Sequence, residues 1–148
     1  MSDLTGGLLP HILPHETDIW SGRMAFASEH PALASRMIEP EGMVSVERLA
    51  ADLHLTRGDL AGLLGMSRDS LSKSARVSSI ATQRRLRDFV EILSRALPWA
   101  GSLPQAHAWF CAQPLPSFGD QTAADLVREG RADAVKAYLA RIAVGGYA

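Results

Sequence analysis

Residues 57–73 read RGDLAGLLGMSRDSLSK and have the spacing of a helix-turn-helix. Ala61 is small enough for a second helix to cross it, and Gly65 can take the positive φ that the turn requires. Ser67 is expected to cap the second helix through the N–H groups of its first turn. The apolar residues of the motif would be Leu60, Leu64, Met66 and Leu71. The stretch therefore predicts two short helices joined by a tight turn.

The second helix of this motif would present polar side chains to a partner. In DNA-binding proteins of this type, the second helix contacts base edges and phosphates in the major groove. The candidates for DNA contact are Ser67, Arg68, Ser70, Ser72, Lys73 and Arg76, with Arg84 and Arg85 as further phosphate contacts. Asp69 opposes phosphate, so a dimer on a two-fold site is expected. The alternative is that the motif only joins two core helices and that its arginines form a solvated face.

Charge divides the chain into three segments around this motif. Residues 1–42 carry two arginines against six carboxylates, and also hold four prolines. Residues 43–97 carry nine basic against six acidic side chains and no proline, whereas residues 98–148 are balanced at four of each. We therefore expect an acidic, partly ordered arm over 1–42, a helix-turn-helix domain over 43–97 and a C-terminal domain over 98–148.

Apolar residues at helical spacing predict further helices beside the motif. One follows a capping residue, Ser45, and another, the first helix of the motif, follows Thr56. A longer helix is predicted over Leu86–Leu97, and Pro98 should end it because the residue before a proline avoids the α-helical region.

The C-terminal segment contains its own helix signals. Thr122 and Asp125 have the spacing of a capping box, and Gly130 is a natural stop for the helix that they begin. Residues 135–142 predict a last amphipathic helix that closes at Gly145. Because no stretch alternates between apolar and polar residues with a period of two, the predicted fold class is all-α, a helix-turn-helix bundle followed by a small helical domain.

Composition limits the class of protein. The chain has 148 residues, 15 basic against 16 acidic side chains, 47% hydrophobic residues and one cysteine. A single cysteine cannot form an internal disulfide, so a reducing compartment is expected. Neither a long apolar run nor the residue order of a signal peptide is present, and the expected location is therefore the cytoplasm.

The sequence offers no arrangement of catalytic or metal-binding residues. His11 and His15 have the i, i+4 spacing of two zinc ligands, but prolines interrupt them and no third ligand follows at a usual interval. Cys111 follows Trp109 and Phe110 and is expected to be a small buried apolar residue rather than a nucleophile. No glycine-rich phosphate loop and no paired carboxylates are present. We therefore expect a binding protein, with neither enzymatic activity nor a cofactor or metal.

The C-terminal segment carries an ordered series of motifs: AHAWF at 106–110, PLPSFGDQT at 114–122, DLV at 125–127, Gly130, Ala134-Val135, Tyr138-Leu139, Arg141-Ile142 and GGYA at 145–148. In this order the motifs resemble the toxin-binding domain of the Xre/MbcA/ParS antitoxins. In that family an Xre-like helix-turn-helix lies upstream, as residues 49–76 do here. Two positions depart from the usual pattern, since Ala123 stands where proline is common and Asp120 where a second glycine is common.

The resemblance implies an antitoxin paired with a RES-type toxin, an enzyme that consumes NAD by degradation or ADP-ribosyl transfer. The antitoxin would be catalytically inert and would cover the NAD cleft of the toxin with its C-terminal segment. Arg141 and Tyr147 are the first candidates for toxin contact. The other candidates are Gly145, Gly146, Ala148, Tyr138 and Phe118. A homodimer that joins toxin in a heterooligomer and represses its own operon is also implied.

Simpler roles remain open for these residues. Phe118 and Tyr138 would equally serve as core residues, and Arg141 would complement the dipole at the end of its helix. The alternative function is a plain transcriptional regulator whose C-terminal segment serves for dimerisation. Loss of residues 145–148 would then leave a partner enzyme unaffected.

Overall fold

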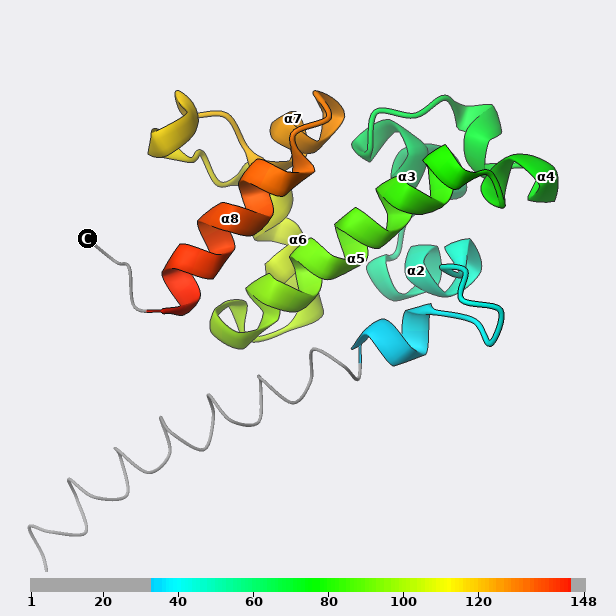
Figure 1. The fold of residues 1–148 in the computed structure, drawn as a ribbon, viewed down its shortest axis with the longest axis horizontal. Coiled ribbons are helices and arrows are strands. Elements are labelled where there is room, and N and C mark those ends of the chain that lie inside the picture. The colour runs from blue at the N-terminus through cyan, green and yellow to red at the C-terminus, as the bar shows by residue number, and fades with distance from the viewer. Residues whose placement is uncertain (1–32, 145–148) are drawn as a thin grey trace, which may run out of the picture.

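The computed structural model describes residues 33–144, and these residues are all-α, as predicted (Figure 1). A helical turn at 33–37 is followed by two pairs of short helices and by one long helix, α5 (Ile80–Ala100). The elements before α5 are α2 (Val46–Leu53), α3 (Arg57–Leu63), the 3-10 turn η1 (Arg68–Leu71) and α4 (Ser74–Val77). Those after it are α6 (Leu103–Ala112), the 3-10 turn η2 (Pro116–Phe118), α7 (Ala123–Arg128) and α8 (Ala132–Ala143).

Helix α5 is the central element. It crosses the middle of the molecule, with α2, α3 and α4 around its first half and α6 and α8 against its second half (Figure 1). One continuous hydrophobic core includes residues from both groups, among them Leu60, Leu64, Phe89, Phe110 and Leu139. The expected boundary between residues 97 and 98 falls inside α5, so both halves of the chain share this helix.

The predicted caps of α2 and α3 are confirmed. The Ser45 hydroxyl accepts a hydrogen bond from the Arg48 N–H, and the Thr56 hydroxyl accepts one from the Asp59 N–H. Gly65 has a φ of 73°, as the turn of the motif requires. These caps satisfy N–H groups that have no partner within the first turn of a helix.

The prediction that Pro98 ends the long helix is wrong, because α5 continues to Ala100. A proline so close to a C-terminus removes one intrahelical hydrogen bond, the one that its N–H would donate to Ser94. The helix ends instead at Gly101, which has a φ of 99° and donates its N–H to the Leu97 carbonyl at 3.0 Å. The added turn places Trp99 edge-on to Trp109, with ring centroids 5.1 Å apart.

The first described residues belong to the core although the sequence assigned them to an N-terminal arm. Leu33 and Met37 are buried, and the backbone of Ile38 pairs with that of Val44 in an isolated bridge. Residues 33–44 therefore pack beside α5 and α2. His11 and His15 lie outside the described residues. None of the described helices combines the length and the apolarity needed to cross a membrane.

Candidate functional site

Two aromatic rings and two guanidinium groups form an alternating row on the C-terminal part of the fold. The Phe118 and Tyr138 rings meet edge to face, with centroids 6.2 Å apart. The guanidinium carbon of Arg131 lies 5.6 Å from the Phe118 centroid, and that of Arg141 lies 5.8 Å from the Tyr138 centroid. Both arginines are exposed and both rings are half-buried. We call Arg131, Phe118, Tyr138 and Arg141 the aromatic–arginine row.

A closed loop holds Phe118 in this row. Leu115 donates its N–H to the Gln121 carbonyl at 2.9 Å, and Asp120 donates to the Leu115 carbonyl at 3.1 Å. Gly119 and Asp120 both have a φ of 64°, and these two left-handed residues reverse the chain over 115–121. Because Leu115 is buried, it anchors the loop to the core, and the anchored loop positions the Phe118 ring.

Helices α7 and α8 supply the other members of the row, and their ends follow the sequence signals. The predicted capping box is confirmed, since Thr122 and Asp125 each accept a hydrogen bond from the backbone of the other. These bonds, with the neighbouring Arg128, hold the pKa of Asp125 below its usual value. The helix stops at Gly130, whose φ is 81°, and Arg131 then donates its N–H to the Leu126 carbonyl at 2.7 Å. Helix α8 begins directly after this turn, and Arg131 at its start lies beside Phe118.

Among the predicted toxin-contact residues, the structure brings Phe118, Tyr138 and Arg141 together. Gly145, Gly146, Tyr147 and Ala148 lie outside the described residues, as does the predicted stop at Gly145. Arg131 was missed by the sequence analysis, where it counted only as a charge. The available signal was its place directly after the predicted helix stop, Gly130. Val144, the last described residue, is 86% exposed, so α8 ends at the surface beside Arg141.

The prediction of a single recognition helix for the DNA-contact residues is wrong. A four-residue 3-10 turn, η1, and the four-residue α4 stand where a single recognition helix was predicted. Ser67 does not cap this element, because its hydroxyl pairs with that of Ser70 at 2.9 Å. The Ser72 hydroxyl likewise donates to the Asp69 carbonyl. Serine side chains that bond locally in this way compete with continuous helix.

The charges of these residues are only partly free. Arg76 lies 3.4 Å from Asp69, and the Arg68 side chain lies over Gly58. Lys73 is exposed between η1 and α4. Among the predicted DNA-contact residues, Ser70 and Arg85 are half-buried, and the others are exposed.

The turn of the motif packs against the C-terminal part of the fold. Arg85, from α5, donates from Nη1 to the Leu64 carbonyl at 2.7 Å and to the Val127 carbonyl at 3.0 Å. These carbonyls belong to the C-terminal ends of α3 and α7. One guanidinium thus joins the helix-turn-helix segment to the elements that carry the aromatic–arginine row.

Residues with catalytic potential do not converge at this surface. Cys111 is exposed, so the expectation that it is buried is wrong; it lies on the outer face of α6. Partial burial nevertheless raises the pKa of its thiol, against the opposing charge of Arg128, and this disfavours the nucleophilic thiolate. Burial also lowers the pKa of His107. No group of three potential metal ligands occurs among residues 33–144.

Comparison with known families identifies the segment that carries the row. Residues 95–145 match the family model described as the antitoxin Xre/MbcA/ParS C-terminal toxin-binding domain. The match begins in the last turns of α5 and covers α6, α7 and α8. Comparisons with curated proteins and with solved structures gave no match. The aromatic–arginine row, with both supporting helices, lies wholly inside residues 95–145, the segment that is similar to this toxin-binding domain.

Proposed function

We propose that this protein is the antitoxin of a type II toxin–antitoxin pair and neutralises a RES-type toxin that consumes NAD. It acts in the cytoplasm as a catalytically inert inhibitor and covers the NAD cleft of the toxin with residues 141–148. The observation that carries the proposal is the position of the aromatic–arginine row inside the family match, beside the surface end of α8.

The chemistry of the row suits a protein interface. Tyrosine and arginine are enriched among the residues that dominate binding energy, because each buries a large area and also makes directed polar contacts. The Tyr138 ring holds the Arg141 guanidinium in place, which reduces the entropy lost when the side chain binds. A guanidinium there would bind carboxylates that line the toxin cleft.

Repression of its own operon is the second part of the proposal. The exposed side chains of Arg68, Lys73 and Arg76 support a DNA-contact surface. With Asp69 beside Arg76, the net charge of one copy is modest, so operator binding would require a homodimer, alone or with bound toxin. A plain transcriptional regulator is the second candidate, favoured by the same surface.

Co-expression with the product of the adjacent gene tests the proposal. The complex would be isolated by size-exclusion chromatography, and NAD consumption by the partner would be measured with and without this chain. A stable complex with suppressed NAD consumption is expected. A neighbour without NAD activity, or one that forms no complex, contradicts the proposal and favours the plain regulator.

A charge-reversed variant sharpens this experiment. Arg141→Glu changes an exposed side chain at the end of α8 and should release NAD consumption in the mixture. Lys73→Glu reverses one charge on the distant DNA-contact surface and should leave inhibition intact. Equal inhibition by both variants would show that the complex forms through another surface.

A further inference from the structure

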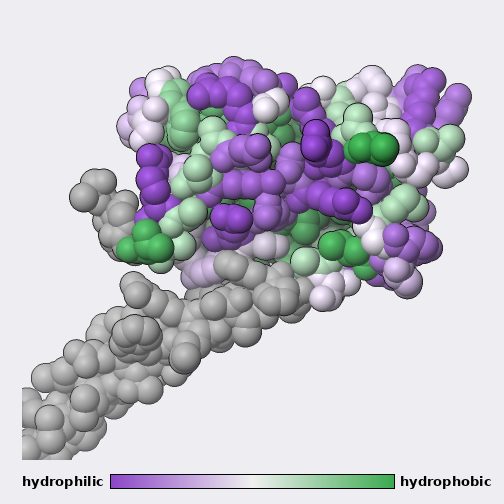
Figure 2. All heavy atoms as spheres, in the orientation of Figure 1, coloured by the Kyte–Doolittle hydropathy of each residue, from purple (hydrophilic) through white to green (hydrophobic). Residues whose placement is uncertain are grey.

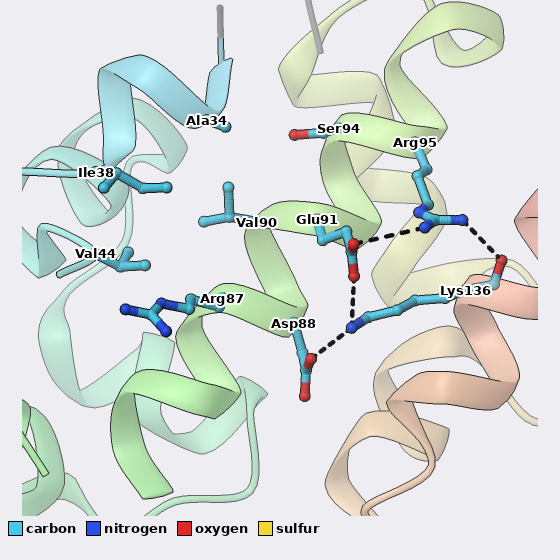
Figure 3. A pocket seen from close by; sticks show the side chains of 10 residues that line it. All are labelled: Ala34, Ile38, Val44, Arg87, Asp88, Val90, Glu91, Ser94, Arg95 and Lys136. Carbon is cyan, nitrogen blue, oxygen red and sulfur yellow. Dashed lines mark hydrogen bonds and ion pairs between the residues drawn. The ribbon is translucent and has the colours of Figure 1, made fainter. Parts of the chain in front are cut away.

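A groove runs beside α5 on the part of the surface that the toxin-binding domain hardly reaches. Its cavity has a volume of about 470 Å³. One wall is apolar and is formed by Ala34, Ile38, Val44 and Val90, whereas the other is charged and is formed by Asp88, Glu91, Arg95 and Lys136 (Figure 3). Only Arg95 and Lys136 of these residues belong to residues 95–145. We call this cavity the α5 groove.

Ser94 gives the α5 groove an unused polar group. Ser94 is 6% exposed, and its hydroxyl has no hydrogen-bond partner among the described residues. Figure 3 shows the hydroxyl on the side of α5 that faces the apolar wall. A buried hydroxyl without a partner is destabilising, so a bound chain that offers a backbone N–H or carbonyl would be stabilised there. Pro98 cannot donate the N–H that would normally serve the Ser94 carbonyl, so α5 lacks one helical bond at the same residue.

The α5 groove continues along the helix toward its N-terminus. An adjoining cavity of about 540 Å³ shares Arg87, Asp88 and Lys136 with it and extends to Met43, Arg84 and Ile80. The Ile80 side chain is 87% exposed, which is unusual for a large apolar residue. From Ile80 to Ser94 the helix rises about 21 Å, a length that about seven extended residues would span. The two cavities therefore have the dimensions of a binding site for a peptide segment.

The charges of this surface favour an acidic occupant. Lys136 and Arg95 together balance the two carboxylates of the groove. The Lys136 Nζ lies 2.6 Å from Asp88 and 2.5 Å from Glu91, and Arg95 lies 3.5 Å from Glu91. Neither Arg84 nor Arg87 pairs with a carboxylate among residues 33–144. The face in Figure 2 is accordingly mainly hydrophilic, with apolar patches between the polar atoms.

We propose that the α5 groove is the docking site of residues 1–32 of the same chain. These residues carry four carboxylates against one arginine, a net charge of −3 that complements Arg84 and Arg87. They also contain apolar residues that suit the wall and Ile80, namely Leu8, Leu9, Ile12, Leu13, Ile19 and Trp20. The described chain begins at Leu33, next to the groove-lining Ala34, so the tether keeps the local concentration of the segment high.

Paramagnetic relaxation in the full-length chain tests this docking. A nitroxide would be attached at Ser21→Cys in a Cys111→Ser background, because the exposed native thiol would otherwise react. Amide signals of residues 84–94 should lose most of their intensity relative to the reduced, diamagnetic sample. The same loss should disappear in an Arg84→Glu/Arg87→Glu variant, which reverses exposed charges at the rim.

Matched controls separate docking from proximity through the tether. Lys73→Glu/Arg76→Glu makes the same change in net charge away from the α5 groove and should keep the signal loss. Circular dichroism should give the same helix content for both variants. Unaffected signals over 84–94, or a loss that persists in Arg84→Glu/Arg87→Glu, would overturn the proposal. A loss seen only when labelled and isotope-enriched chains are mixed would also overturn it and assign the α5 groove to a second copy.

Discussion

Gly65 lies directly against Arg128: a Cβ atom at position 65 would come within 3.1 Å of the Arg128 Cα. The turn of the helix-turn-helix segment and the end of α7 therefore approach so closely that a side chain at position 65 would make a tighter contact than ordinary van der Waals packing. Arg85 supports the same junction by donating to the Leu64 and Val127 carbonyls. The helix-turn-helix segment and α7 are thus joined by a close backbone contact and by one half-buried arginine.

Gly65→Ala should destabilise the fold by about 2 kcal/mol, because an L residue is strained at this positive φ and its methyl group meets α7. The measurement is the free energy of unfolding in urea. Gly62→Ala is the matched control, since this helical glycine has open space at its Cβ and should gain about 0.5–1 kcal/mol. Equal effects of the two substitutions would contradict the close approach of Gly65 to Arg128.

Arg85→Ala should lower the free energy of unfolding by about 2 kcal/mol, because two helix-end carbonyls lose a charged donor. Arg85→Lys should recover part of this loss, as an ammonium group donates but cannot reproduce the planar geometry of the guanidinium. The exposed neighbour Arg84 provides the control, and Arg84→Ala should stay within about 0.5 kcal/mol of the parent. An Arg84 variant as unstable as the Arg85 variant would contradict this assignment.

The ion pairs of Lys136 should make stability depend on pH. Burial by itself raises the pKa of Glu91, but the hydrogen bond and charge of Lys136, with Arg95, hold that pKa below its usual value. Burial likewise lowers the pKa of Lys136, and Asp88 and Glu91 together raise it above its usual value. The Glu91 contribution is therefore present above the pKa of the unfolded carboxyl and is lost as the pH falls through the lower pKa of the folded state.

Glu91→Gln tests this dependence in urea unfolding between about pH 7 and about pH 3. Because the Glu91 side chain is 44% exposed, solvent screening limits the expected loss to about 0.5–1 kcal/mol at neutral pH. The difference between parent and variant should shrink as the medium becomes acidic. A difference that stays constant across this range would show that Glu91 contributes through packing and not through its charge.

Sequence reasoning predicted the helix starts and turns correctly where one residue determines local geometry. Ser45, Thr56 and Thr122 each cap a helix through their own hydroxyl, and Gly65 and Gly130 take the left-handed backbone that their positions require. Such features depend on neighbouring residues in the chain, so they can be derived before any tertiary contact is known.

Features that depend on distant contacts were not predictable in this way. Helix α5 continues past Pro98, where Trp99 contacts Trp109. The predicted recognition helix is replaced by η1 and α4, where the hydroxyls of Ser67, Ser70 and Ser72 form local hydrogen bonds. The aromatic–arginine row joins a loop residue, Phe118, to α8 residues about twenty positions later. Periodicity gives the face of each helix but not its neighbour, so Arg131 had no recognisable role before its position over Phe118 was known.

Arg68→Ala and Lys73→Ala test the proposed operator binding. If each side chain contacts phosphate, each substitution should weaken binding and reduce the slope of log affinity against log salt concentration by about 1. The measurement is a titration of operator DNA at several salt concentrations. Arg141→Ala removes an equal charge from the toxin-binding domain and should leave the slope unchanged. Unchanged slopes for both Arg68→Ala and Lys73→Ala would show that η1 and α4 do not contact the DNA backbone.

Loss of the C-terminal segment tests the proposed covering of the toxin cleft. Deletion of residues 145–148 removes Tyr147 and keeps every described residue through Val144. Toxin affinity should fall by at least about thirty-fold, as for loss of a residue that dominates an interface. Arg141→Ala should have a similar effect because the guanidinium over Tyr138 would contact the same cleft. Operator binding should be unchanged in both variants, which separates loss of contact from loss of folding. Full inhibition by the deleted chain would refute the cleft-covering mechanism and would leave Phe118, Tyr138 and Arg131 as the residues to test next.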